Sequence, residues 1–183
     1  MRFIAGTPDI PDELIKDVSD GHTVFLCGAG VSMRVGLPLF GKLTDQIYAE
    51  IGETPNNEAA EIEALKRQEY DRALGSLERR TRLPKMASRV RIATTKLLTP
   101  APGLAAPDHL NLLRLSRDAD GRVRLLTTNF DPLFECAAHT DGQTVPSHAV
   151  KAIPRPGTPD DYGILHLHGR ISLAMLLFGV SMA

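Results

Sequence analysis

The sequence predicts an α/β fold, with a Rossmann-like, mostly parallel, doubly wound sheet that carries a helical insertion and is incomplete at the C-terminus. Apolar β-like runs alternate with amphipathic helical stripes, as in parallel sheets whose strands are joined by helices. Three of these runs end in short polar motifs, and residues that leave parallel strands at their carboxyl ends can converge on one crevice. The motifs are Gly28-Ala29-Gly30-Val31-Ser32, Thr127-Thr128-Asn129-Phe130-Asp131 and His166-Leu167-His168-Gly169.

The length and composition favour a single domain. The chain has 183 residues, of which 43% are hydrophobic, and a formal net charge of -1. We therefore expect one domain over residues 1–183, with a helical insertion at approximately 42–98 and a truncated C-terminal segment at approximately 170–183. The near-neutral charge argues against a protein that coats nucleic acid.

The two cysteines and the chain ends indicate a cytoplasmic protein. Cys27 and Cys136 lie far apart and outside any C-x-x-C pattern, so neither a disulfide framework nor a four-thiolate zinc site is expected. Acidic residues stand where a secretory signal would be apolar. The apolar stretch 173–182 is about half the roughly 20 residues that a membrane-spanning helix needs, so we expect it to be buried.

The first half of the chain predicts one strand among several helices. The expected helices lie at 8–19, 42–51, 58–77 and 86–97. Residues 23–27 form a continuous apolar run, which is typical of a strand buried on both faces of a parallel sheet. Gly52 supplies a C-terminal stop for the second helix, and the proline-rich segment 99–103 is expected to form a loop.

The second half predicts the rest of the sheet. The expected helices lie at 110–115 and 132–138, and the expected strands at 123–127, 144–153 and 163–167. A turn at Asp120-Gly121 leads into the first of these strands, and the loop 154–159 separates the last two. This order of elements places each polar motif directly after a strand.

The first motif suits an approach by phosphate groups. Gly28 and Gly30 lack a Cβ atom, so their backbone N–H groups are accessible to a pyrophosphate, and a following helix N-terminus would favour its charge. Ser32 adds a hydroxyl donor. Alternatively, the segment is a tight turn with Ser32 as the helix N-cap. The continuation from Gly36 through Pro38 to Phe40 suggests a loop that folds over a dinucleotide.

The second and third motifs supply polar side chains at strand ends. Asp131 precedes Pro132 and is expected to cap a helix that begins there, although Asn129 and Asp131 also suit a carboxamide and ribose hydroxyls. His166 and His168 are two apart, so they form either a metal-binding pair or one packed and one exposed side chain. His168 is either a general base or a hydrogen-bonded structural residue.

A basic segment lies outside these motifs. Seven cations occur between positions 79 and 96 with no acidic residue among them: Arg79, Arg80, Arg82, Lys85, Arg89, Arg91 and Lys96. Such a run forms a solvated helix face or docks to nucleic acid or to an acidic partner.

The order of the motifs GAGVS, GLP-x-F, TTNFD and HG, from about Thr23 to Gly169, resembles the sirtuin (silent information regulator) superfamily. The resemblance is strongest to the divergent bacterial branch that depletes NAD in phage defence. It implies an NAD+ glycohydrolase that releases nicotinamide and ADP-ribose, with NAD+ as substrate and without a metal. The alternative is a non-catalytic module that binds NAD or ADP-ribose, or an inactive remnant.

The resemblance also implies a role for each site residue. Asn129 would orient the nicotinamide ribose or a water molecule, Asp131 would hold the nicotinamide end, and His168 would act as base. The residues implied to bind the cofactor are Gly28, Ala29, Gly30, Ser32, Pro38, Phe40, Thr127 and Thr128.

Two departures from the family pattern limit these expectations. Neither cysteine follows His168, and Leu39 and Gly41 replace the Asp and Arg of the deacylase cofactor loop, so protein deacylation is disfavoured. The chain also ends where the family would continue with further strands, which predicts a truncated product, an obligate homo-oligomer or poor solubility. We also expect control by a regulatory protein partner or by oligomerisation.

Overall fold

The computed structural model describes residues 5–55, 59–150 and 152–171, which form two compact units. The sheet unit comprises the described residues within Met1–Val31 and Gly103–Arg170. The helical unit comprises those within Ser32–Pro102, together with Ile171.

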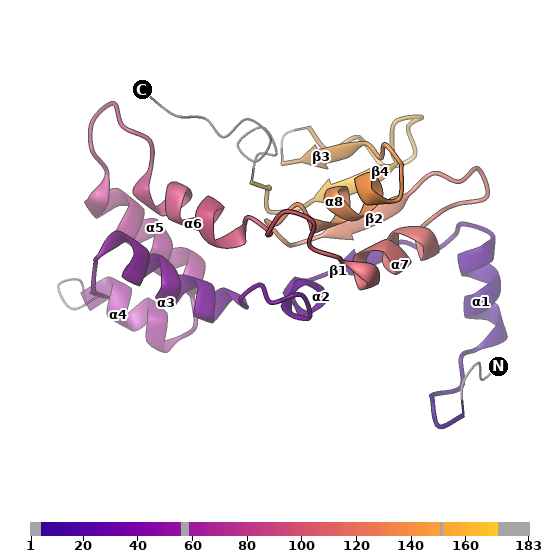
Figure 1. The fold of residues 1–183 in the computed structure, drawn as a ribbon, viewed down its shortest axis with the longest axis horizontal. Helices are drawn as coiled ribbons and strands as arrows, with labels where there is room; N and C mark the ends of the chain where they lie inside the picture. The colour runs from indigo at the N-terminus through magenta and orange to yellow at the C-terminus, as the bar shows by residue number, and fades with distance from the viewer. Residues whose placement is uncertain (1–4, 56–58, 151, 172–183) are drawn as a thin grey trace. The chain divides into compact units, whose positions relative to one another are not determined.

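The sheet unit contains a parallel four-stranded sheet in the order β1-β2-β4-β3 (Figure 1). Its strands are β1 (Phe25–Cys27), β2 (Arg124–Thr127), β3 (Ser147–Ala149) and β4 (Gly163–His166). The register pairs Cys27 with Thr127, Thr127 with His166, and Ala149 with His166. The last residues of all these strands therefore lie in one row at the carboxyl edge of the sheet. The predicted α/β class with a parallel sheet is confirmed.

The sheet unit contains the helices α1 (Asp12–Ser19), α7 (Pro107–Leu115), α8 (Leu133–Thr140) and the short α2 (Ala29–Met33), in which the chain passes to the helical unit. The core is formed with α7 and α8, whereas α1 has no buried residue. Leu125 and Ile164 of the sheet are fully buried, as are Leu133 and Phe134 of α8. The ring of His109 in α7 packs edge-on against Phe134 at a centroid distance of 4.7 Å. Burial of these apolar side chains fixes α7 and α8 in the unit.

One expectation for β1 was wrong. A strand buried on both faces was expected at 23–27, but Leu26 is 65% exposed and Val24 is 46% exposed. Side chains alternate between the faces of a strand, and the described residues cover only the face that carries Cys27. An apolar run alone does not reveal which face is covered.

The helical unit consists of α3 (Phe40–Ile51), α4 (Ala59–Lys66), α5 (Tyr70–Thr81) and α6 (Arg89–Leu98), shown in violet to rose in Figure 1. Ile47 of α3, Ala73 and Leu77 of α5 and Ala93 of α6 are buried at the centre of this unit. Gly52 ends α3 in the left-handed conformation, with φ of 68°, as the sequence predicts.

The single helix expected at 58–77 is instead two helices. The chain turns at Gln68, whose φ is 60°, and Glu69 N–H donates to the carbonyl of Ala64 over 2.8 Å. Together with the bond from Gln68 N–H to Leu65, this forms a Schellman motif that satisfies the last carbonyls of α4. A glycine usually marks such a turn in the sequence, but here the residue is Gln68. The apolar periodicity continues across the break, so the sequence predicts one helix.

The helix expected at 86–97 begins later, at Arg89. Ser88 caps it by accepting a hydrogen bond from Arg91 N–H at 3.2 Å, whereas Met86 lies before the helix and is 66% exposed.

Among residues 5–55, 59–150 and 152–171, no helix is long and apolar enough to cross a bilayer. The stretch 173–182, for which burial was expected, lies outside the described residues.

Candidate functional site

The three polar motifs leave neighbouring strands at one edge of the sheet. Cross-strand hydrogen bonds continue one residue past the strand ends: Thr128 N–H donates to Cys27 O at 3.0 Å, and Leu167 N–H donates to Thr127 O at 2.9 Å. The start of the second and third motifs is therefore fixed by the sheet itself. The predicted convergence at the carboxyl edge is confirmed for β1, β2 and β4.

The glycines of the first motif are not required by the local fold. Neither Gly28 nor Gly30 has a positive φ. A Cβ atom added to Gly28 would make only an ordinary contact of 3.6 Å with the Thr128 hydroxyl, and one added to Gly30 would meet nothing within 4 Å. Both positions thus leave room for a group to approach the backbone closely.

The alternative in which Ser32 is an N-cap is wrong. Ser32 lies inside α2 and is 2% exposed, and Ala29 is the first residue of that helix. Because α2 has only five residues, its dipole is small, and any anion here would depend on individual N–H groups.

Asn129 connects the three motifs. It is 5% exposed, and its N–H donates to the Thr127 hydroxyl at 3.0 Å, while its side-chain amide donates to Gly28 O at 3.2 Å. Its carbonyl oxygen lies 2.9 Å from Nδ1 of His166. The Thr127 hydroxyl in turn donates to Cys27 O at 3.2 Å, so this hydroxyl both accepts from and donates to the backbone. Asn129 is thereby linked to β1, β2 and β4 at once.

Asp131 was expected to be the N-cap of α8, but Pro132 holds that position and Asp131 lies one residue before it. Asp131 is 4% exposed, and its Oδ1 accepts a hydrogen bond from Leu133 N–H at 3.2 Å, at the start of α8. The sequence predicts that this helix begins at Pro132, but it begins at Leu133. A contact of Asp131 with a ligand stays a prediction.

The two histidines of the third motif differ in environment. β4 ends at His166, which is fully buried, whereas His168 lies in the following turn and is exposed. The ring of His168 lies 6.4 Å from that of Phe130, measured between centroids. The reading of one packed and one exposed histidine is confirmed. Among the described parts of the chain, no group of three His, Cys, Asp or Glu side chains could hold a metal ion.

Sequence reasoning missed a charged cluster beneath this edge. Oε1 of Glu135 lies 2.9 Å from Nε2 of His166, accepts a hydrogen bond from Ser147, and lies 3.2 Å from Nη1 of Arg170. Burial alone would raise the pKa of Glu135, but the hydrogen bond and charge of His166 and the hydrogen bond from Ser147 hold this pKa below its ordinary value. The sequence feature that could have revealed this cluster is the carboxylate of Glu135 within the apolar stretch of α8, directly after Leu133 and Phe134.

The cysteines are poor nucleophiles in this environment. Burial raises the pKa of the Cys27 thiol. Burial also raises the pKa of Cys136, with further contributions from the charges of Glu135 and Asp131. Both side chains are therefore thiols and not thiolates near neutral pH.

The other predicted cofactor-binding residues belong to the helical unit. These are Ser32, Pro38 and Phe40. Pro38 is half-buried, and Phe40 at the start of α3 is 37% exposed, with its ring 5.6 Å from that of Tyr70. Their contacts with a cofactor stay predictions.

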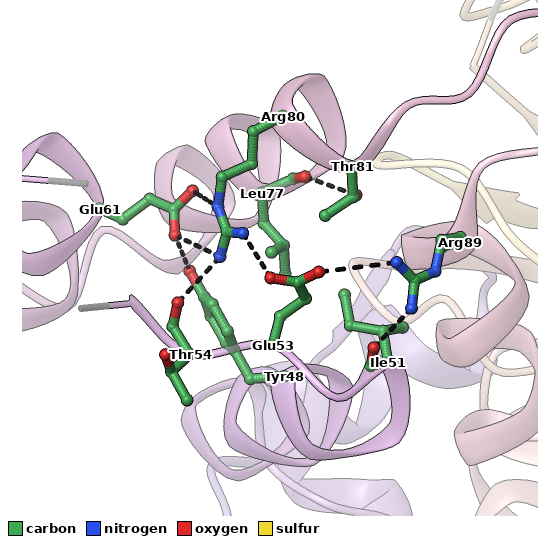
Figure 2. A network of polar contacts seen from close by, with 9 residues as sticks. All are labelled: Tyr48, Ile51, Glu53, Thr54, Glu61, Leu77, Arg80, Thr81 and Arg89. Carbon is green, nitrogen blue, oxygen red and sulfur yellow. Dashed lines mark hydrogen bonds and ion pairs between the residues drawn. The ribbon is translucent and has the colours of Figure 1, made fainter. Parts of the chain in front are cut away.

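Much of the basic segment is neutralised within the helical unit. Figure 2 shows Arg80 between two carboxylates, with Nε 2.8 Å from Oε1 of Glu61 and Nη1 2.6 Å from Oε2 of Glu53. Tyr48 also donates to Oε2 of Glu61 at 2.8 Å. Burial and the Glu61 hydrogen bond raise the pKa of Tyr48, and the hydrogen bonds of Glu61 and Glu53 raise that of Arg80.

Three further cations of this segment form ion pairs. Arg89 pairs with Glu53, Arg91 with Glu78, and Lys96 with Glu50. These contacts favour an ion-paired helix face over a surface that docks to nucleic acid.

Surface hollows lie elsewhere in each unit. One of about 600 Å³ lies between α5 and α6, and two of about 420 and 450 Å³ lie beside the loop around Thr158. None of these three is lined by a predicted site residue.

Comparison with known proteins adds one relative. No protein-family model matches the chain. A protein of Sinorhizobium fredii, named uncharacterized protein y4cA, is 39% identical over 178 residues, which cover 94% of this chain and 14% of that protein. The chain therefore spans about one seventh of the length of this relative, whose name specifies no activity.

Proposed function

We propose that the sheet unit is the NAD+-binding core of a sirtuin-like enzyme with a Rossmann-like, doubly wound fold, and that the enzyme hydrolyses the nicotinamide N-glycosidic bond. The products would be nicotinamide and ADP-ribose. A role in phage defence belongs to the same proposal, as does assembly into a homo-oligomer or with a regulatory protein.

The position of Asn129 is the observation that carries the proposal. Its hydrogen bonds to Gly28 and Thr127, and its contact with His166, tie the residue to all three motifs on which the family resemblance rests. The start of α8 does not require these links, because Asp131 alone accepts the hydrogen bond from Leu133 N–H there. A buried amide held at a strand edge is suited to orienting a polar ligand.

The residues of this edge fit a dinucleotide. The space beside Gly30 lets a phosphate reach the backbone N–H groups, and the half-buried Thr128 adds a hydroxyl next to Gly28. NAD+ supplies a cationic leaving group when bound, so the protein has mainly to position the ribose and to stabilise charge. Asn129 would orient the ribose or the attacking water. His168, whose side chain is exposed, would act as the base that accepts a proton from that water.

The test is nicotinamide release from NAD+ by the 183-residue chain, compared with the Asn129→Ala and His168→Ala variants. We expect release by the wild type and a loss of at least about a hundredfold in each variant. Replacing the exposed His139 by Gln provides a matched control on α8, because this residue lies outside the motifs.

Calorimetric binding of NAD+ separates the remaining possibilities. Binding without release by the folded wild-type chain would favour a non-catalytic binding module. If the folded chain neither binds NAD+ nor releases nicotinamide from it, the proposed NAD+ site in this chain is refuted.

A further inference from the structure

Both ring nitrogens of His166 contact oxygen atoms that accept hydrogen bonds. Nδ1 lies 2.9 Å from the carbonyl oxygen of Asn129, and Nε2 lies 2.9 Å from Oε1 of Glu135. The His166 side chain is fully buried, and that of Glu135 is 9% exposed. Water therefore has little access to either contact.

These two contacts require two ring hydrogens. A neutral imidazole has one donor and one acceptor nitrogen, whereas a carbonyl oxygen and a carboxylate oxygen only accept. In either neutral tautomer, one nitrogen lone pair would face an oxygen lone pair at 2.9 Å. A ring that carries both hydrogens satisfies both oxygens.

A proton on Glu135 is the competing arrangement, and the surroundings of Oε1 oppose it. The Ser147 hydroxyl donates to this oxygen, and the Arg170 guanidinium lies 3.2 Å away. Three donors from β3, β4 and the segment after β4 therefore converge on one carboxylate oxygen, which favours the ionised form. A buried imidazolium is also far less costly beside an ionised carboxylate than alone.

We propose that His166 is an imidazolium held by Glu135, and that this pair is a positioning device that fixes the backbone of Asn129 at the carboxyl edge of the sheet. The charged and polar groups that face the pair are Ser147 of β3, Arg170 and the Asn129 carbonyl. Neither His166 nor Glu135 is assigned a contact with the reacting atoms. The positioning role rests on the proposed function of Asn129, whereas the protonation state does not.

The first test is nuclear magnetic resonance of the full chain labelled with ¹⁵N in its histidine rings, without NAD+. We expect both ring nitrogens of His166 to carry a hydrogen at about pH 7, because each faces an oxygen that only accepts. The Glu135→Gln variant should hold a single hydrogen, on Nδ1, because a glutamine amide can donate to Nε2. His166→Asn assigns the signals, and His139→Gln is the control.

The second measurement follows Asn129 itself. The Phe130 amide shares a peptide group with the Asn129 carbonyl, so its resonance should move in Glu135→Gln and stay in place in His139→Gln. In a chain that releases nicotinamide, Glu135→Gln should lower kcat about tenfold or more and leave NAD+ affinity nearly unchanged.

The outcomes separate this proposal from the proposed function. A wild-type His166 with a single ring hydrogen at about pH 7 would overturn the imidazolium, whatever the chain does to NAD+. An unmoved Phe130 amide in Glu135→Gln would overturn the positioning role. Absence of nicotinamide release would count against the proposed function, while the spectra of the chain without NAD+ would still decide the state of His166.

Discussion

The two units each bury a carboxylate beside a cation, but they use its oxygens differently. In the helical unit, Glu61 is fully buried with both oxygens engaged, by Arg80 and by Tyr48 (Figure 2). In the sheet unit, the donors to Glu135 converge on Oε1, and Oε2 is buried without a hydrogen-bond partner among the described residues. The network around Glu61, in which both carboxylate oxygens are hydrogen-bonded, joins α4 to α3 and α5. The Glu135 cluster instead contacts Asn129, just after the end of β2, through His166.

The largest change in the free energy of unfolding is expected from breaking the hydrogen-bond network around Glu61. Glu61→Ala leaves Arg80 and the Tyr48 hydroxyl without their buried acceptor, and we expect a loss of about 3–5 kcal/mol in the free energy of unfolding. Urea denaturation measures this loss. Glu63→Ala on the same helix is the control, because its ion pair with Arg67 is exposed and should contribute less than about 1 kcal/mol. Equal losses in the two variants would contradict the assigned role of the network.

A somewhat smaller effect is expected where the backbone of the sheet unit is tightest. Gly163 begins β4 with φ of +112°, and an added Cβ would overlap the carbonyl oxygen of Pro146. We expect Gly163→Ala to lower the free energy of unfolding by about 2–4 kcal/mol. Gly30→Ala should change it by less than about 1 kcal/mol, because nothing lies near the new methyl group. A large loss in Gly30→Ala would show that this glycine serves the fold and not a ligand.

The smallest effect concerns the dependence of stability on pH. The folded-state pKa of Glu135 lies below its ordinary value of 4.5, so near that pH the unfolded chain binds more protons than the folded one. The stabilisation by Glu135 is therefore complete above this range and is lost as the pH falls through the folded-state pKa. We expect the difference in unfolding free energy between the wild type and Glu135→Gln to shrink between about pH 6 and about pH 3. A difference that grows on acidification would have the wrong sign.

The sequence predicted the carboxyl edge because its signals are local. Each strand there ends in a glycine or a polar residue directly after an apolar run, and Gly52 and Asp131 mark helix ends in the same local way. The break at Gln68 was missed because a residue other than glycine adopts the left-handed conformation there.

The polar clusters could not be predicted, since their members are far apart in the chain. Glu135 and His166 are 31 positions apart, and Glu61 and Arg80 are 19 apart. Apolar periodicity does not indicate which buried carboxylate meets which cation. The exposure of Leu26 was missed for a related reason, because a strand does not specify which of its faces is covered.

The hydrogen bonds that continue the sheet past its strands have an evolutionary consequence. They join the backbone N–H groups of Thr128 and Leu167 to the backbone carbonyls of Cys27 and Thr127, so they persist with any residue except proline at positions 128 and 167. Mutation can therefore vary the chemistry presented at this edge while the strand register is inherited unchanged. At this edge of the sheet the side chains can diverge, whereas the backbone hydrogen bonds that set the strand register are kept.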